Sequence, residues 1–170
     1  MPEHGYSTIV EQILDHPGIA VQLNTHFERS QHSDYRHVFY SGPIDAWFNF
    51  KYGRLGYRTV TFETHYADGD FQGTTQMNYC DENVPYTRIT EHKHFTYWEK
   101  HNETILFKEF SKETTEEDIP YYPKRLQQDK ELLMQYRRDA EQLDKTSFLG
   151  RLATYRYMDM HHVIGEALDY

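Results

Sequence analysis

The sequence contains a single cysteine, Cys80, so an internal disulfide is excluded and a reducing compartment is expected. No apolar run approaches the length of a membrane span, and the opening residues MPEHGYS lack the charged and then apolar pattern of a secretory signal. Basic residues are also in the minority: 18 Lys and Arg stand against 27 Asp and Glu, which gives a net charge of −9. A phosphate backbone requires a basic surface, so nucleic acid is not expected as a partner. These features predict a soluble, cytoplasmic protein that binds neither nucleic acid nor membrane.

Aromatic residues, in contrast, are abundant. The chain has 15 tyrosines and 10 phenylalanines, more than the core of a 170-residue domain needs. A tyrosine offers a ring face that stacks on a sugar or a base and a hydroxyl that forms hydrogen bonds. The abundance therefore indicates either a ligand site rich in tyrosine or a tyrosine-rich sheet, and both can hold.

The first forty residues show one helical and two extended patterns. Thr8 and Glu11 have the spacing of a capping box, which predicts a short helix over about 8–15. Alternating apolar residues predict a strand over 19–23, and the apolar run at 38–40 predicts a short buried strand.

The middle of the chain, from Arg58 to Phe110, alternates with a period of two. We expect four antiparallel strands that follow one another as a meander. If the hairpin loop Asp81–Pro85 is symmetric about Asn83, Asn78 lies opposite Arg88 and both side chains project from one face.

Two helices are predicted in the last third of the chain. The first begins at Pro123, a residue suited to the first turn, and runs to about Leu143. The second follows Asp159, whose carboxylate can accept hydrogen bonds from the first N–H groups of an amphipathic segment that starts at Met160. We expect its N-terminus just after Tyr157, where free amides suit a phosphate or an electron-rich carbonyl of a cofactor.

Four stretches of sequence carry a resemblance to a known family. They are YSGPIDAWFNFKYGRLGYR at 40–58, NYCDENVPYTRITEHKHF at 78–95, PYYP at 120–123 and GRLATYRYMDM at 150–160. With these stretches the chain resembles the C-terminal half of a UDP-galactopyranose mutase from about Ile19 to Leu168. The Gly-rich, flavin-binding strand–turn–helix with which that family begins is not found in the 170 residues.

The resemblance completes the expected fold. We predict an α+β fold, in which a four-stranded antiparallel sheet is flanked by helices and remnants of a Rossmann-like FAD-binding layer lie at both ends of the chain. The expected parts are a partial Rossmann-like layer at 1–57, the substrate-binding sheet at 58–122, and a helix with a flavin-contacting segment at 123–170. We expect the three parts to form one compact unit.

A substrate site centred on Arg88 is the main functional implication. TRITEHKHF matches the family stretch that supplies a diphosphate-binding arginine, and a guanidinium grips a diphosphate through two parallel hydrogen bonds. We therefore expect Arg88 to be the catalytic and substrate-binding arginine. The other substrate-binding residues that the resemblance implies are Asn78, Tyr122, Tyr157 and Arg58. Arg58 and Glu109 both match positions near the family's site. The alternative to a site role for these two residues is an ion pair that braces the sheet.

FAD, active in its reduced form, is the cofactor that the resemblance implies. Arg151 and the helix start match positions that contact the flavin. The expected cofactor-binding residues are Gly150, Arg151, Asp159, Met160, His161, His162 and Val163. A helix N-terminus directed at the pyrimidine edge of the flavin would stabilise the negative charge of the reduced form.

The reaction implied is the interconversion of UDP-galactopyranose and UDP-galactofuranose through a flavin–sugar adduct, in the synthesis of galactofuranose-containing surface polysaccharides. The partners expected are UDP-galactose and either a second copy of the chain, as a homodimer, or a missing N-terminal half. Because the Gly-rich pyrophosphate loop is not among these residues, we expect the isolated chain to be inactive. The alternative is a non-catalytic, truncated relative that acts as a nucleotide-sugar-binding or interaction module.

Three other groups of residues receive structural interpretations. His92 and His94 share a face of the predicted strand but have no further ligand at a recognisable spacing, so we expect no metal site. Acidic residues between 103 and 113 do not define a glycosidase pair, since carboxylate separation cannot be read from sequence. Cys80 has no evident partner base and is interpreted as a buried strand thiol.

Overall fold

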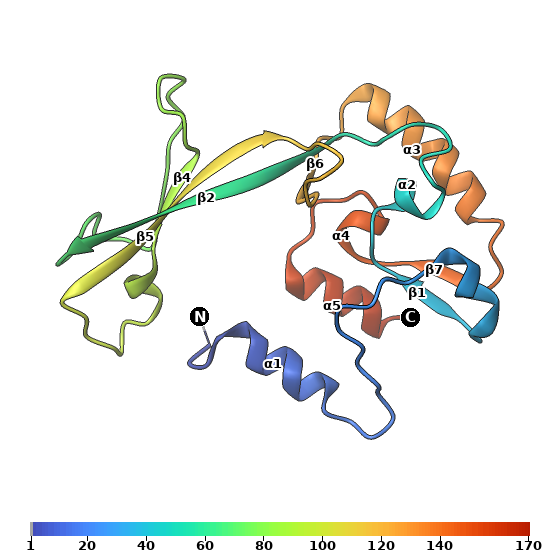
Figure 1. The fold of residues 1–170 in the computed structure, drawn as a ribbon, viewed down its shortest axis with the longest axis horizontal. Coiled ribbons are helices and arrows are strands. Elements are labelled where there is room, and N and C mark those ends of the chain that lie inside the picture. Colours follow the sequence, from blue (N-terminus) through green and yellow to red (C-terminus); the bar gives the residue numbers. More distant parts are fainter. Residues whose placement is uncertain (1) are drawn as a thin grey trace. The chain divides into compact units, whose positions relative to one another are not determined.

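The structure, a computed structural model, describes residues 2–170 (Figure 1). The chain forms two compact units by its internal contacts, each built from two stretches of sequence. The sheet unit comprises Met1–His26 and Thr61–Ser111, and the core unit comprises Phe27–Val60 and Lys112–Tyr170. We describe each unit by itself.

The elements occur in a mixed order of helices and strands, as expected for an α+β chain. Their bounds are α1 Gly5–Leu14, η1 Arg29–Asp34, β1 Val38–Tyr40, α2 Ile44–Trp47, β2 Tyr57–Asp68, β3 Gln76–Asn78, β4 Arg88–Glu91, η2 His92–Phe95, β5 Glu103–Glu113, β6 Tyr122–Pro123, α3 Gln127–Ala140, β7 Thr146–Phe148, α4 Gly150–Ala153 and α5 Met160–Leu168, where η marks a 3₁₀ helix.

The core unit is organised around a small parallel sheet. β1 and β7 pair with Val38 opposite Thr146 and Tyr40 opposite Phe148, which confirms the short strand predicted at 38–40. Within residues 2–170 this parallel sheet consists of β1 and β7 alone. The Rossmann-like character of this region therefore stays a prediction.

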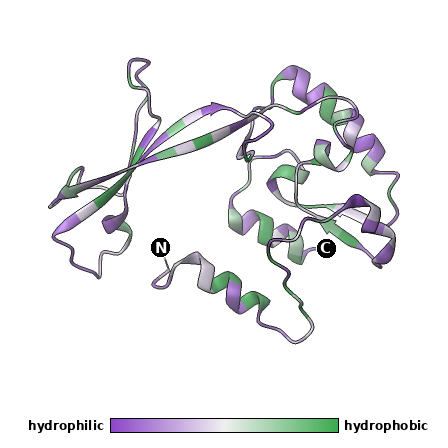
Figure 2. Ribbon diagram, in the orientation of Figure 1, coloured by the Kyte–Doolittle hydropathy of each residue, from purple (hydrophilic) through white to green (hydrophobic). Residues whose placement is uncertain are grey.

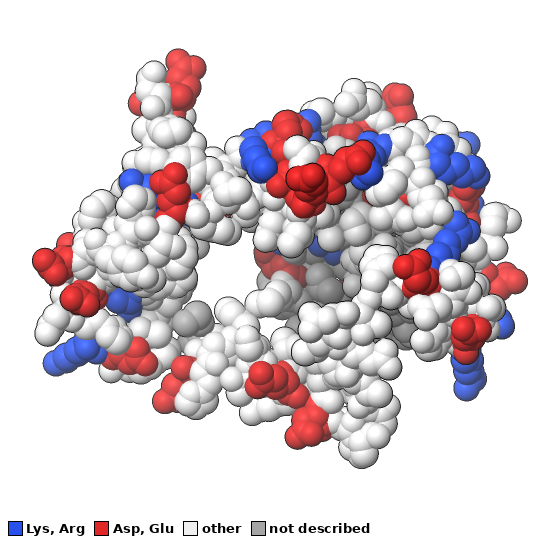
Figure 3. Space-filling model, in the orientation of Figure 1, with Lys and Arg blue, Asp and Glu red and all other residues white. Residues whose placement is uncertain are grey.

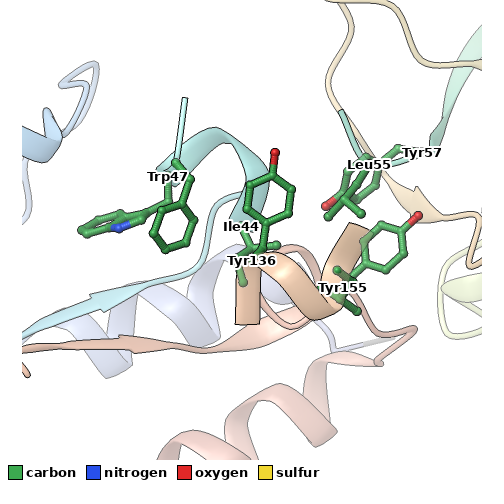
Figure 4. Packing of buried hydrophobic residues seen from close by; sticks show 8 residues of the cluster. Ile44, Trp47, Leu55, Tyr57, Tyr136 and Tyr155 are labelled. Atoms are coloured by element: carbon green, nitrogen blue, oxygen red, sulfur yellow. The ribbon is translucent and has the colours of Figure 1, made fainter. Parts of the chain in front are cut away.

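Aromatic residues dominate the buried core of this unit. Its members are Ile44, Trp47, Phe48, Leu55, Tyr57, Leu133, Tyr136 and Tyr155, and Figure 4 shows how they pack. The rings of Tyr57 and Tyr155 meet edge to face with centroids 5.1 Å apart, an arrangement that adds to the free energy of simple burial. The hydroxyl of Tyr136 donates to the Gly53 carbonyl (2.6 Å) and accepts from the Tyr52 amide (3.1 Å). A phenol can be fully buried here because its polar end is satisfied.

Helix α3 begins later than the sequence predicted. Pro123 does not start the helix, because it lies in β6 and pairs with Tyr57 of β2. The helix starts at Gln127, where the Asp129 carboxylate accepts the Leu126 amide (2.9 Å) and the Gly56 amide (3.0 Å). One buried carboxylate therefore caps α3 and fixes it to the chain that enters β2.

The prediction of four antiparallel strands in the order of the sequence was wrong in two respects. The sheet has five strands in the order β3-β4-β5-β2-β6, so β2 lies beside β5 instead of next to β3. The extra strand, β6, comes from the PYYP stretch, for which no strand was predicted. The pairs β3–β4 and β4–β5 are antiparallel, as expected, and the additional pair β2–β6 is antiparallel too.

The strand predicted to continue to Phe95 ends at Glu91. His92–Phe95 form the 3₁₀ helix η2, so His92 and His94 do not share a strand face. The side chain of Glu91 is fully buried, and its two carboxylate oxygens accept the backbone amides of Phe71 (3.0 Å) and Gln72 (2.8 Å). This carboxylate anchors the loop between β2 and β3 to the end of β4.

The N-terminal segment contains the expected helix but not the expected strand. Helix α1 starts at Gly5, three residues before the predicted start, and the Thr8 hydroxyl donates back to the His4 carbonyl instead of capping. None of its side chains is buried, although Figure 2 shows apolar residues along it. Residues 19–23 lie outside helices and strands, so the strand predicted there was wrong.

Two further properties bear on the membrane and nucleic-acid partners that the sequence analysis did not expect. No helix in the described part of the chain combines the length and apolarity needed to cross a membrane. On the face shown in Figure 3, acidic side chains lie among the basic ones. That mixture is the arrangement expected from the net charge of −9.

Candidate functional site

Three polar side chains form a row across the sheet unit. Asn78 of β3 pairs with Arg88 of β4, and Arg88 pairs with Glu109 of β5, so all three project from one face. The Asn78–Arg88 pairing is the one that the symmetric hairpin predicted, and it is confirmed. Arg88 Nε donates to Asn78 Oδ1 (2.9 Å), and Arg88 Nη1 lies 3.7 Å from Glu109 Oε2.

The guanidinium of Arg88 keeps access to solvent from this position. Its side chain is 34% exposed, whereas that of Glu109 is 14% exposed. Asn78 takes one donor of Arg88, whereas Glu109 forms an ion pair with it at 3.7 Å, beyond hydrogen-bond distance. A guanidinium has five N–H groups in a planar fork. The remaining donors can bind a phosphate or carboxylate that approaches the open face.

A largely apolar groove of about 530 Å³ lies beside Arg88. Phe62 and Phe107 line it, with the side chains of Gln76 and Thr90 as polar groups. His92 also lines the groove, and burial holds the pKa of its imidazole below the ordinary value, which favours the neutral form. The groove thus adds no cationic imidazole to the positive charge of Arg88.

The two tyrosines expected at the substrate lie together in the core unit. The rings of Tyr122 and Tyr157 are stacked, with centroids 5.9 Å apart and planes 14° apart. The guanidinium of Arg151 lies 5.3 Å from the first ring and 4.7 Å from the second. Its Nε and Nη2 donate to the Met158 carbonyl (3.0 and 2.5 Å). Arg151 therefore holds the segment that carries Tyr157 against the one that carries Tyr122.

The residues expected to bind the flavin surround the start of α5. Gly150 is buried with φ +80°, and a Cβ there would lie 3.7 Å from Val163 Cγ1 and 3.9 Å from Ser41 Cβ. Asp159 precedes α5 as expected, but its side chain accepts no cap hydrogen bond, so that part of the prediction was wrong.

No side chain among the described residues therefore caps the amides at the start of α5. Such an end can accept the electron-rich edge of a flavin, and in this respect the residues fit the cofactor. His161 and His162 are exposed beside it, with ring centroids 3.9 Å apart. Arg151 fits less well as a direct flavin contact, because two of its nitrogens already donate to Met158.

Arg58 lies at the start of β2, in the core unit. Its Nη1 is 3.3 Å from Glu113 Oε1, and the Lys124 ammonium donates to the same carboxylate (2.8 Å). Hydrogen bonding to Lys124, with the charge of Arg58, holds the pKa of Glu113 below its ordinary value. The predicted site residues thus fall into two groups, Asn78 and Arg88 in the sheet unit and Arg58, Tyr122, Tyr157 and the flavin set in the core unit.

Two clusters of potential metal ligands occur among the described residues. They are Asp70, Glu91 and His94 in the sheet unit, and Asp159, His161 and His162 at the start of α5. In the first, both Glu91 oxygens accept backbone amides, and His94 Nε2 lies 3.1 Å from Asp70 Oδ1. Hydrogen bonds within the fold already use these atoms, which explains the cluster without a metal.

The prediction that Cys80 is buried was wrong. It follows β3 at the start of the hairpin loop and is exposed, because the strand ends at Asn78 and the chain has left the sheet. We expect the folded chain to react with a thiol reagent such as Ellman's reagent to one equivalent, as fast as the unfolded chain does within a few-fold. A Cys80→Ser variant is the blank, and protection of the thiol in the folded chain would contradict this exposure.

The chain matches known proteins over nearly all of its length. A family model described as UDP-galactopyranose mutase matches residues 1–157. The chain belongs to the UDP-galactopyranose mutase family. The match covers nearly the whole chain, including the Asn78–Arg88 row, Tyr122 and Tyr157.

Three named relatives are 30–50% identical to this chain over the aligned residues. A probable UDP-galactopyranose mutase of Klebsiella pneumoniae is 50% identical over 99% of the chain and 44% of its own length. A dTDP-fucopyranose mutase of Escherichia coli is 44% identical, with 99% and 47% covered, and a UDP-galactopyranose mutase of Mycoplasma pneumoniae is 30% identical, with 99% and 46% covered. The chain therefore spans slightly less than half the length of these relatives.

One contact of the site was missed from sequence. Glu109 had been considered with Arg58 as a bracing pair, whereas the structure places it opposite Arg88. The signal was available in principle, because the alternation that puts Asn78 opposite Arg88 continues into β5. The length of the loop between β4 and β5, part of which is the 3₁₀ helix η2, hid the register.

Proposed function

We propose that this chain is part of a FAD-dependent mutase that interconverts UDP-galactopyranose and UDP-galactofuranose, an intramolecular isomerisation. Family membership supports the reaction class. The observation that carries the proposal is the row in which Asn78 accepts a hydrogen bond from Arg88 and the Arg88 side chain stays 34% exposed. A diphosphate is the part of a nucleotide sugar that such an arginine recognises.

In this proposal the residues of the chain bind and orient the substrate. In the sheet unit Arg88 holds the diphosphate. In the core unit the stacked Tyr122 and Tyr157 are the substrate-binding side chains that the family resemblance implies. Arg58, also in the core unit, is a further proposed substrate-binding residue. The isomerisation requires UDP to leave the sugar and return to it, so retention of UDP by these residues contributes directly to turnover.

FAD would be held at the start of α5, whose amides have no side-chain cap among the described residues, and near Gly150. A reduced flavin bound there would supply the nucleophile for the sugar, and the residues of this chain would hold and orient it. The positive end of α5 would stabilise negative charge on the ring system. The partition into 1–57, 58–122 and 123–170, the Rossmann-like origin of the outer parts, the cytoplasmic location and the homodimer or missing-half partnership belong to the same proposal.

Two alternatives have specific support. The E. coli relative is named for dTDP-fucopyranose, so a dTDP sugar is the second candidate substrate. A non-catalytic module that binds nucleotide sugars is the second candidate function, because the Asn78–Arg88 pair lies within the sheet unit and a guanidinium can bind a diphosphate without a flavin. Uracil and thymine differ by one methyl group, which a single apolar contact discriminates only weakly.

A chimera tests the proposal. The 170 residues are joined to the unmatched remainder of the Klebsiella relative, and the chimera and the isolated chain are assayed with reduced FAD on UDP-galactopyranose and on dTDP-fucopyranose. We expect the chimera to interconvert the UDP sugar and the isolated chain to do nothing. A folded, flavin-loaded chimera that converts neither sugar, beside an isolated chain that binds UDP, would support the non-catalytic module instead.

The isolated chain is expected to purify with less than one flavin per molecule. The start of α5 offers a few backbone donors, whereas tight dinucleotide binding uses a Gly-rich loop that cradles the pyrophosphate. The ratio of absorbance near 450 nm to that at 280 nm, calibrated with free FAD, measures the occupancy. A stoichiometric flavin spectrum would refute this expectation.

A further inference from the structure

We propose that Asn78 and Glu109 are positioning residues for Arg88, and that the Glu109 carboxylate lowers the affinity of Arg88 for anionic ligands. The inference rests on the proposed role of Arg88 as the diphosphate ligand. It adds two residues with opposite electrical effects to that site, one neutral and one charged.

The geometry of the row supports the positioning role. The three side chains stand directly opposite one another on adjacent strands, so their separation is set by the sheet and not by flexible loops. Asn78 Oδ1 accepts the Nε–H of Arg88 at 2.9 Å, which fixes the plane of the guanidinium. Glu109 is itself held, because the Thr87 hydroxyl donates to its Oε1 at 3.1 Å. Arg88 is therefore clamped from both sides.

The charge of Glu109 has a separate consequence. Its Oε2 lies 3.7 Å from Arg88 Nη1, and only 14% of its side chain is exposed, so water screens it weakly. A diphosphate that binds Arg88 must approach this carboxylate, and the like charges repel. Asn78 has no such effect, since an amide carries no net charge. The row thus holds the arginine in place while weakening its attraction for anions.

Substitutions that change charge but not shape separate this inference from a purely structural role. Glu109→Gln keeps an acceptor for Thr87 and removes the negative charge, so affinity for inorganic pyrophosphate and for UDP should rise about fivefold. Asn78→Asp adds a carboxylate on the other side of Arg88, so affinity should fall about fivefold. Glu103→Gln, an exposed position at the far end of the same strand, is the control and should change little.

The measurement is NMR titration of the isotope-labelled 170-residue chain with pyrophosphate and with UDP, at fixed ionic strength. The exchange rate of the Arg88 Nε proton is a second readout that needs no ligand, and it should increase in Asn78→Ala because the acceptor is lost. If either Glu109→Gln weakens binding or leaves it unchanged, or the Nε proton exchanges equally fast in Asn78→Ala, the inference is overturned while Arg88 remains the ligand. If the wild-type chain binds neither probe, the assignment of Arg88 falls and this inference falls with it.

Discussion

Arg88→Ala is expected to weaken UDP binding by about ten- to a hundredfold, since a charge-assisted hydrogen bond to phosphate contributes roughly 1.5–3 kcal/mol. The structure supports an effect at the upper end, because Asn78 already orients the guanidinium and little order is lost on binding. Titration of the isolated chain measures the affinity. Turnover of the chimera should fall at least as much, because UDP must stay bound while it is detached from the sugar.

Arg88→Lys is the matched variant for this prediction. An ammonium keeps the charge but loses the planar fork, so affinity should recover only in part. An arginine that merely braces the sheet predicts another outcome: a lower melting temperature with normal UDP affinity in the folded fraction. Finding that pattern would remove Arg88 from the site.

Glu91→Ala is expected to lower the free energy of unfolding by about 3 kcal/mol, because two amides at the β2–β3 loop lose a charged acceptor. The side chain is fully buried, and both oxygens are used by Phe71 and Gln72. Glu82→Ala, at an exposed loop position, is the control, and its change in the free energy of unfolding should be near zero. Urea denaturation followed by circular dichroism measures both, and equal effects of the two substitutions would contradict the role of Glu91.

The same carboxylate makes stability depend on pH. Burial alone would raise the pKa of Glu91, but the amides of Phe71 and Gln72 outweigh it and hold the pKa below its ordinary value. The pKa of Asp70 is also lowered, chiefly by its hydrogen bond with His94. A lowered folded-state pKa stabilises the fold above the ordinary carboxyl range and loses that contribution as pH falls through the folded value. Stability should therefore decline below about pH 4, and the decline should be shallower in Glu91→Ala.

The sequence carried the local part of the fold well. Alternation on both sides of a short loop was enough to pair Asn78 with Arg88, because a hairpin register depends on neighbouring residues alone. The family was identified from stretches such as TRITEHKHF, and the family match confirms it. The C-terminal helix was found from its apolar stripe, which the structure shows as α5.

Pairings between segments far apart in the chain could not be predicted from sequence patterns in the same way. β6 has two residues, Tyr122 and Pro123, which carry no alternation, and it is a strand only because β2 offers an edge to it. The 3₁₀ turn at His92–Phe95 and the buried Glu91 depend on a loop some twenty residues earlier in the chain. Sequence patterns are read from neighbouring residues, whereas the partners of these segments lie elsewhere in the chain.

By itself the sequence determined the family, the amphipathic helices and the face of the hairpin that carries Asn78 and Arg88, because each is written in spacings of a few residues. Tertiary structure decided that Glu109 completes the row beside Arg88, that Arg151 holds the Tyr122–Tyr157 stack, and that Asp129 and Glu91 are buried acceptors. These contacts join segments far apart in the chain. Their partners are fixed only when packing brings the backbones together, since a buried polar group must be satisfied by whichever donor the fold supplies.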